Sequence, residues 1–116
     1  MFRHAALLAL TTLALVSAPA DARTNQPRTD RVVGTWRSSN GTPIYLNYTG
    51  NAKTLIVGVT KRPGDEVDYT GTWTSDSTFS YRIDGETVIA TYNARTDLIN
   101  AHTRSGDWSA TWHRRR

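Results

Sequence analysis

The sequence contains no cysteine and a single methionine among its 116 residues. The absence of cysteine excludes disulfide bonds, thiolate nucleophiles and zinc sites built on thiolates. Hydrophobic residues make up only 38% of the chain, and no apolar run approaches the ~20 residues that a membrane-spanning helix needs. We expect one domain and no membrane span, since a domain usually contains roughly 100–150 residues.

The body of the chain also has little net charge. The net charge of +4 comes from 14 basic and 10 acidic residues, and 114–116 is a run of arginines. The rest of the chain is close to neutral, which predicts a basic C-terminal tail over 114–116 and no specific nucleic-acid partner. A few charges at a chain end bind anionic surfaces only weakly.

Residues 1–22 have the pattern of a secretory signal peptide. A short basic start precedes an apolar run over 5–16, and small residues follow it. The pattern predicts cleavage near Ala20 or Ala22. We therefore expect a secreted or periplasmic protein.

Residues 23–31 are polar and show no apolar period. This composition, together with Pro27, predicts a flexible N-terminal arm. No window of the mature chain favours a helix, because β-branched and aromatic residues dominate its apolar stretches.

Residues 32–113 alternate between apolar and polar types with a period of two, which is typical of half-buried strands. The predicted strands are 32–38, 43–49, 54–61, 66–74, 78–83, 87–92, 98–103 and 107–113. Asn40-Gly41 and Asp84-Gly85 between them favour the positive φ angles of type I′ hairpin turns. The pattern predicts an all-β fold, an eight-stranded antiparallel up-and-down β-barrel, with a β-sandwich as the alternative.

Most of the aromatic side chains fall on the predicted inner face of these strands. They either fill the barrel, whose eight strands leave room for little more than side chains, or line a ligand site at one barrel mouth. Tyrosine and tryptophan suit such a site because each joins an apolar ring to a polar tip. The second interpretation predicts a small apolar or amphipathic ligand bound by Trp36, Thr42, Tyr48, Tyr69, Trp73, Tyr81, Tyr92 and Trp108.

Residues suited to catalysis are few. The mature chain has two histidines, His102 and His113, and most of its carboxylates lie in predicted turns. The sequence has no nucleophile-elbow, phosphate-loop or metal-binding motif. We therefore expect a binding protein rather than an enzyme, with no cofactor and no metal.

A Gly-x-Trp sequence occurs at 34–36, at 71–73 and at 106–108. A small secreted eight-stranded meander that opens on Gly-x-Trp resembles the calycin group, which comprises lipocalins, fatty-acid-binding proteins and avidins. The resemblance implies a barrel that binds a small ligand. Lipocalin-like proteins also pack a late arginine across the first tryptophan, a position that Arg114 would match.

The likeness to avidin and streptavidin extends to 41–42 and 107–111. It implies that Trp36 lines the pocket and that the hydroxyl of Thr42 bonds the ligand. It also implies that Trp108 caps the site of a neighbouring subunit, so an oligomer is compatible with this sequence.

An alternative hypothesis makes the chain an inhibitor of another secreted protein. Small bacterial barrels that block metalloproteases or lysozymes are similar to it in size, in compartment and in a Gly-x-Trp opening. In the metalloprotease inhibitors a flexible N-terminal arm enters the protease cleft, and residues 23–31 would form that arm. The partner would then be a secreted protein target, and deletion of the arm would leave the thermal midpoint almost unchanged.

Overall fold

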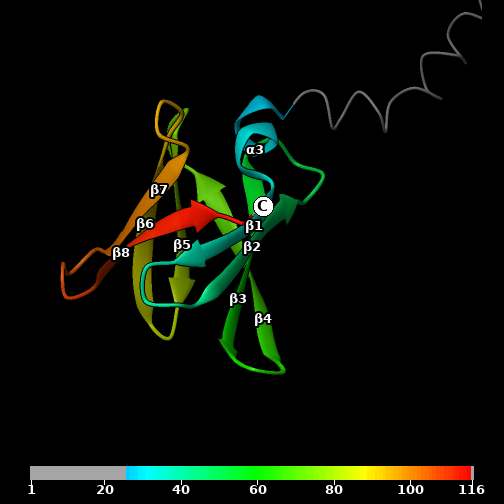
Figure 1. Cartoon of the computed structure of the whole chain (residues 1–116). Coiled ribbons are helices and arrows are strands. Elements are labelled where there is room, and N and C mark those ends of the chain that lie inside the picture. The colour runs from blue at the N-terminus through cyan, green and yellow to red at the C-terminus, as the bar shows by residue number, and fades with distance from the viewer. Residues whose placement is uncertain (1–25, 116) are drawn as a thin grey trace, which may run out of the picture.

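A closed barrel of eight antiparallel strands makes up most of residues 26–115, the part of the chain that the computed structural model describes (Figure 1). The elements are α3 (Pro27–Val32), β1 (Gly34–Ser38), β2 (Pro43–Tyr48), β3 (Thr54–Arg62), β4 (Asp65–Trp73), β5 (Thr78–Ile83), β6 (Glu86–Asn93), β7 (Leu98–Thr103) and β8 (Ser109–Arg114). Each strand pairs with the next, and β8 pairs back with β1. The predicted all-β class and up-and-down barrel are confirmed, and the β-sandwich is excluded.

The observed strands begin and end within two residues of the predicted bounds. Asp84 and Gly85 have φ angles of 52° and 81°, as the predicted type I′ turn requires. The other predicted type I′ turn is wrong, because only Gly41 has a positive φ there, at 94°. The side-chain oxygen of Asn40 accepts the N–H of Thr42 at 3.1 Å instead, which closes the turn locally.

Buried side chains from all eight strands form one apolar core inside the barrel. Trp73 packs edge-on against Phe79, with ring centroids 5.1 Å apart. Gly71 leaves room for this packing, since a Cβ at that position would lie 2.9 Å from a methyl carbon of Leu55. The glycine of this Gly-x-Trp sequence therefore allows the neighbouring strand to approach closely.

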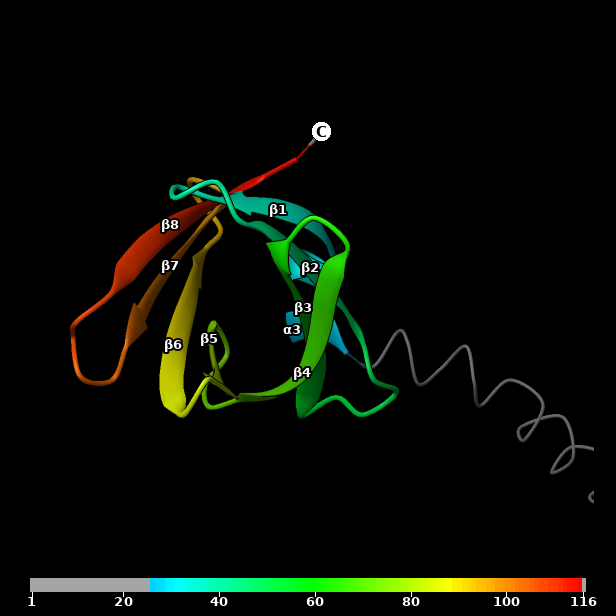
Figure 2. The same ribbon diagram turned by 90° about the horizontal axis from the view of Figure 1, so that it is seen from below.

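The seam between β4 and β5 is the shortest in the barrel. Its two paired positions are Thr72↔Ser80 and Trp73↔Phe79, both near α3. The strands separate towards the opposite end, which Figure 2 shows from below. The rings of Tyr69 and Tyr81 face each other across this separation, with centroids 6.1 Å apart.

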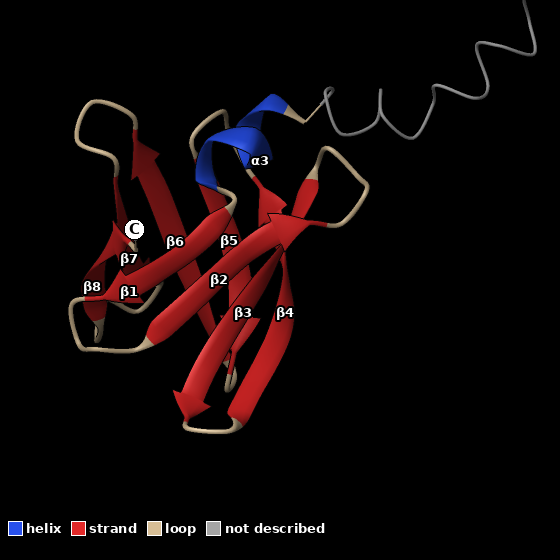
Figure 3. Ribbon diagram, turned by 45° about the vertical axis from the view of Figure 1, so that its right-hand side comes forward, coloured by secondary structure: helices blue, strands red, loops and turns tan. Residues whose placement is uncertain are grey.

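Helix α3 covers one end of the barrel (Figure 3). Thr29 and Val32 are both 0% exposed. They lie on one face of the helix, because they are three residues apart. The indole N–H of Trp36 donates to the carbonyl of Val32 at 2.8 Å, and that of Trp73 donates to the hydroxyl of Thr29 at 3.0 Å. The hydroxyl of Tyr48 also donates to the carboxylate of Asp30 in α3.

These contacts correct the prediction of a flexible arm over 23–31 for the part that is described. Pro27 lies in the first turn of α3, where proline is favoured because its missing N–H would have no helical partner. Arg28 holds the helix further by donating to the carbonyl of Ala52 at 3.2 Å. The predicted signal peptide over 1–22 and its cleavage sites lie outside the described residues.

The predicted basic tail over 114–116 is also corrected, because Arg114 belongs to β8. Its guanidinium lies over the ring of Trp36, 4.4 Å from the centroid, and pairs with Asp97 at 2.9 and 3.0 Å. It also donates to the carbonyls of Val33 and Arg31, at 3.2 and 2.7 Å. The position expected for Arg114 across the first tryptophan is thus the one observed.

Candidate functional site

A cavity of about 420 Å³ opens at the end of the barrel opposite α3. Its volume falls in the lower part of the range of roughly 300–1,000 Å³ that is usual for small-molecule sites. Residues from the β1–β2, β5–β6 and β7–β8 connections surround the mouth, while α3 contacts the connections at the other end. The barrel therefore has one closed end and one end with room for a ligand.

The cavity is lined mainly by aliphatic side chains and aromatic rings. The aliphatic side chains are those of Ile44, Val59, Ile83 and Val88, and the rings are those of Tyr81, Trp108 and Trp112. Trp112 is fully buried and lies 6.4 Å, centroid to centroid, from Tyr81. Trp108 is only partly buried and lies nearer the mouth. Such a surface favours a flat apolar molecule, because ring faces offer large contact area and few rotatable bonds.

Polar groups lie around the mouth. The ammonium group of Lys61 on β3 pairs with the carboxylate of Asp84 in the β5–β6 turn at 2.7 Å. Hydrogen bonds to Asp84 and then to Tyr69 raise the pKa of Lys61 above its usual value. Both groups are solvent-exposed, so the pair adds little to stability. The pair links the end of β3 to the β5–β6 turn, at the end of the barrel where β4 and β5 do not pair.

Tyr81 connects the cavity wall to the core. Burial, and secondly the charge of nearby Tyr69, raise the pKa of the Tyr81 hydroxyl above the usual 10.0. A raised pKa in the folded state stabilises the fold at pH values below about 10. That stability is lost as the pH rises from about 10 through the folded-state pKa.

We expect Tyr81→Phe to weaken this alkaline loss of stability. The variant has no group to ionise at that position, so its free energy of unfolding should fall less between about pH 9 and about pH 12 than that of the wild type. Urea denaturation at a series of pH values measures the difference. Equal slopes for the two proteins would show that Tyr81 does not control the alkaline transition.

The structure brings together three of the eight predicted site residues. Thr42, Tyr81 and Trp108 line the open-end cavity. Four others contact α3 at the closed end and do not line this cavity; these are Trp36, Tyr48, Trp73 and Tyr92. Alternate residues face inward along the whole length of a strand, so the alternation alone could not separate residues of the open end from those of the closed end.

The closed-end tyrosine on β6 is held by local polar contacts. The hydroxyl of Tyr92 donates to the carboxylate of Asp97 at 2.9 Å, and the ring of Tyr92 packs edge-on against Trp36. Burial, followed by the hydrogen bond to Asp97, raises the pKa of Tyr92. These contacts give Tyr92 a structural role at the end that α3 covers.

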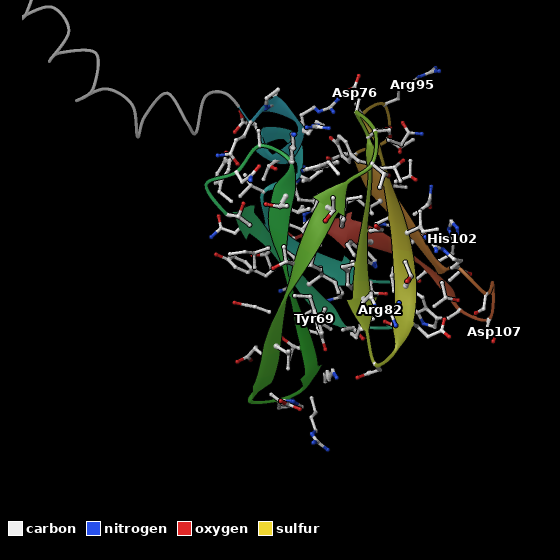
Figure 4. All side chains as sticks on the ribbon, turned by 180° about the vertical axis from the view of Figure 1, so that it is seen from behind. Tyr69, Asp76, Arg82, Arg95, His102 and Asp107 are labelled. Atoms are coloured by element: carbon white, nitrogen blue, oxygen red, sulfur yellow. The ribbon has the colours of Figure 1, made fainter. Side chains whose placement is uncertain are left out.

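Tyr69, the eighth predicted residue, lies on the β4–β5 seam rather than in the cavity lining. It borders a polar surface groove of about 420 Å³ together with Arg82. Figure 4 shows these two side chains on either side of the seam, with His102 and Asp107 directed away from the barrel. Tyr69 therefore lies beside the cavity through its ring contact with Tyr81.

Sequence reasoning missed several lining residues that the strand pattern contains. Lys61 is two residues from Val59 on β3, and Glu86 is two residues from Val88 on β6, so each charged residue lies on the inward-facing side of its strand. Both charged residues were overlooked because a charge near a turn is usually solvated. Trp112 on β8 also lines the cavity, and it is not among the eight predicted site residues.

The described residues offer few general indications of function. Within residues 26–115, no helix has the length and hydropathy to cross a bilayer, and no cluster of three or more histidine or acidic side chains could hold a metal ion. Comparison of the chain with protein-family models, with curated proteins and with solved structures finds no match. The open-end cavity is the strongest candidate site.

Proposed function

We propose that this protein is a secreted, non-enzymatic binding protein that holds a small apolar or amphipathic molecule in its open-end cavity. The observation that carries the proposal is the asymmetry of the barrel. One end is filled by Trp36 and Trp73 and covered by α3, whereas the other leaves about 420 Å³ between aromatic walls. The resemblance of the Gly-x-Trp opening to the calycin group supports the same proposal.

The composition of the cavity supports a bound ligand rather than a packing defect. Interiors of proteins are close-packed, and a void lined by apolar side chains lowers stability in proportion to its volume. A cavity that is retained at the mouth, with mainly apolar walls and with its charged groups around the rim, has the layout of a small-molecule site. The apolar walls would supply affinity and the rim would orient the ligand.

A bulky residue at the mouth tests the proposal. Thr42 lines the cavity from the β1–β2 connection and is only partly buried, so Thr42→Trp should obstruct the mouth without disturbing the core. With the neutral fluorophore N-phenyl-1-naphthylamine as the probe, we expect saturable binding to the wild type. The variant should bind at least about tenfold more weakly, which is about 1.4 kcal/mol.

Ala94→Trp is the matched control. Ala94 is exposed in the β6–β7 connection at the closed end, so the same ring is added far from the cavity. We expect wild-type affinity for the probe, measured by fluorescence titration. Equal affinities for all three proteins, or no binding to the wild type, would contradict the proposal.

The inhibitor hypothesis receives less support. It requires a free arm over 23–31, but the described part of this segment includes most of α3, which is bonded to Trp73, Tyr48 and Ala52. Entry into the cleft of a protease would require these contacts to break. The small-molecule site is therefore the function that the geometry favours.

A further inference from the structure

The buried tryptophans differ in whether their indole N–H groups are bonded. At the closed end, Trp36 donates to a carbonyl of α3 and Trp73 donates to a hydroxyl of α3. The Nε1 atom of Trp112 is buried and has no hydrogen-bond partner among residues 26–115. Buried indole N–H groups are usually bonded, because a buried donor without an acceptor destabilises the fold. Trp112, the exception, is the fully buried tryptophan that lines the cavity.

Trp112 lies where a ligand would end. It belongs to β8, opposite Ser38 on β1 and Ile99 on β7, and its ring packs against Phe79 with centroids 6.3 Å apart. Phe79 belongs to the core and not to the cavity lining, so Trp112 stands between the two. A molecule that enters from the mouth would therefore meet this ring at its inner end.

The charges of the lining limit what the inner end of the ligand can be. Lys61 is the only cation among the described lining residues, and it is exposed at the mouth and paired with Asp84. Glu86 adds a carboxylate that forms no ion pair with any cation of the described chain. Besides the indole of Trp112, the buried polar groups of the lining are the neutral hydroxyls of Ser38 and Thr103. Neutral donors alone do not compensate the burial of a carboxylate, and Glu86 would repel an anion at the mouth. The buried acceptor must therefore be neutral.

We infer that the cavity takes a neutral, planar apolar molecule with a carbonyl-type acceptor at its buried end, which receives the indole N–H of Trp112. This inference rests on the proposed function and specifies its ligand class. The flat body would lie among Tyr81, Trp108 and the aliphatic side chains, and the carbonyl would accept the buried indole N–H of Trp112, which has no partner among residues 26–115. Aryl ketones, quinones and lactones belong to this class.

Matched probes test the inference on the wild-type protein. We would titrate 1-acetonaphthone, 1-ethylnaphthalene and 1-naphthoate, which share a ring system and differ in the acceptor and its charge. The ketone and the hydrocarbon should both bind, and the anion should bind at least about tenfold more weakly than the ketone. In the ¹H–¹⁵N spectrum, the indole signal of Trp112 should move downfield with the ketone and not with the hydrocarbon.

A change at Trp112 separates the hydrogen bond from the general affinity of the cavity. In Trp112→Phe, the affinity of the ketone relative to the hydrocarbon should fall by about three- to tenfold, since the hydrocarbon uses only the apolar walls. Benzothienylalanine at position 112 replaces the N–H by sulfur at nearly constant volume, and it serves if the phenylalanine variant does not fold. The same replacement at Trp36 is the control, because that N–H bonds to α3, and it should leave the ratio unchanged.

The outcomes distinguish this inference from the proposed function. If both naphthalenes bind but their affinity ratio is the same with and without the Trp112 N–H, the inference is wrong and the site remains. Tight binding of 1-naphthoate would also overturn the neutral ligand class. If neither naphthalene binds the wild type, both the site and the inference are wrong.

Discussion

Removal of residues 23–31 is expected to lower the free energy of unfolding by roughly 3–5 kcal/mol. The truncated chain loses Thr29, which accepts the buried indole N–H of Trp73, and it loses the helical cover of the closed end. The deletion also removes the buried side chains of Gln26 and Thr29, which are 1% and 0% exposed. Urea denaturation of the two chains measures the difference. The inhibitor hypothesis predicts the opposite, a nearly unchanged midpoint.

Point variants keep this experiment interpretable. Val32→Asp places a carboxylate at a fully buried position of α3 and should destabilise the protein to a similar extent. Pro27→Ala changes an exposed residue of the same helix and should alter stability by less than about 1 kcal/mol. If the truncation and Val32→Asp both match the wild type, α3 does not stabilise the barrel.

Arg114→Ala is expected to lower the free energy of unfolding by roughly 2–4 kcal/mol. The guanidinium covers the ring of Trp36, makes two hydrogen bonds to Asp97 and satisfies the carbonyls of Arg31 and Val33. Its removal leaves a partly buried carboxylate without this cation. The side chains of Arg114 and Asp97 are 20% and 29% exposed, so the loss is smaller than for a fully buried pair.

The neighbouring arginine provides the control for this variant. Arg115 is exposed, and Arg115→Ala should change stability by no more than about 0.5 kcal/mol. Arg114→Lys keeps the charge but loses the planar fork, so its stability should lie between those of the wild type and Arg114→Ala. Equal stabilities of the two alanine variants in thermal or chemical denaturation would show that Arg114 acts only as a surface charge.

The strands and their inner faces were predictable because both follow from a period of two. Val57 and Val59 on β3, and Val88 and Ala90 on β6, are buried as their alternation requires. Short polar turns imposed neighbouring antiparallel pairs, and eight such strands with one apolar face close most simply into a barrel. Local pattern and overall fold agree here, so the sequence sufficed for the architecture.

The division between the two ends of the barrel was not predictable from that pattern. Trp73 and Tyr81 both face inward, but Trp73 ends β4 beside α3 whereas Tyr81 lines the open cavity. The difference depends on which end α3 covers. Alternation reports the face of a strand and carries no information about depth along the barrel axis.

Helix α3 itself was missed because it is a single short segment of six residues. Such a length is below that of an independently stable helix, so its formation depends on tertiary contacts. Two local signals were present: a proline in the first turn, and the spacing of Thr29 and Val32. Both also occur in extended segments, and the docking that decides between them involves Trp73, which is 44 residues from Thr29 along the chain.

The separation of a filled, helix-covered end from an open end also bears on how this protein can change over evolution or by design. Substitutions in the connections around the mouth, at Asn40 or Thr42 for example, fall outside the packed half that gives the barrel its stability. Loops on a rigid scaffold tolerate such variation. A library confined to the mouth would therefore change the shape and polarity of the open-end cavity while retaining the fold.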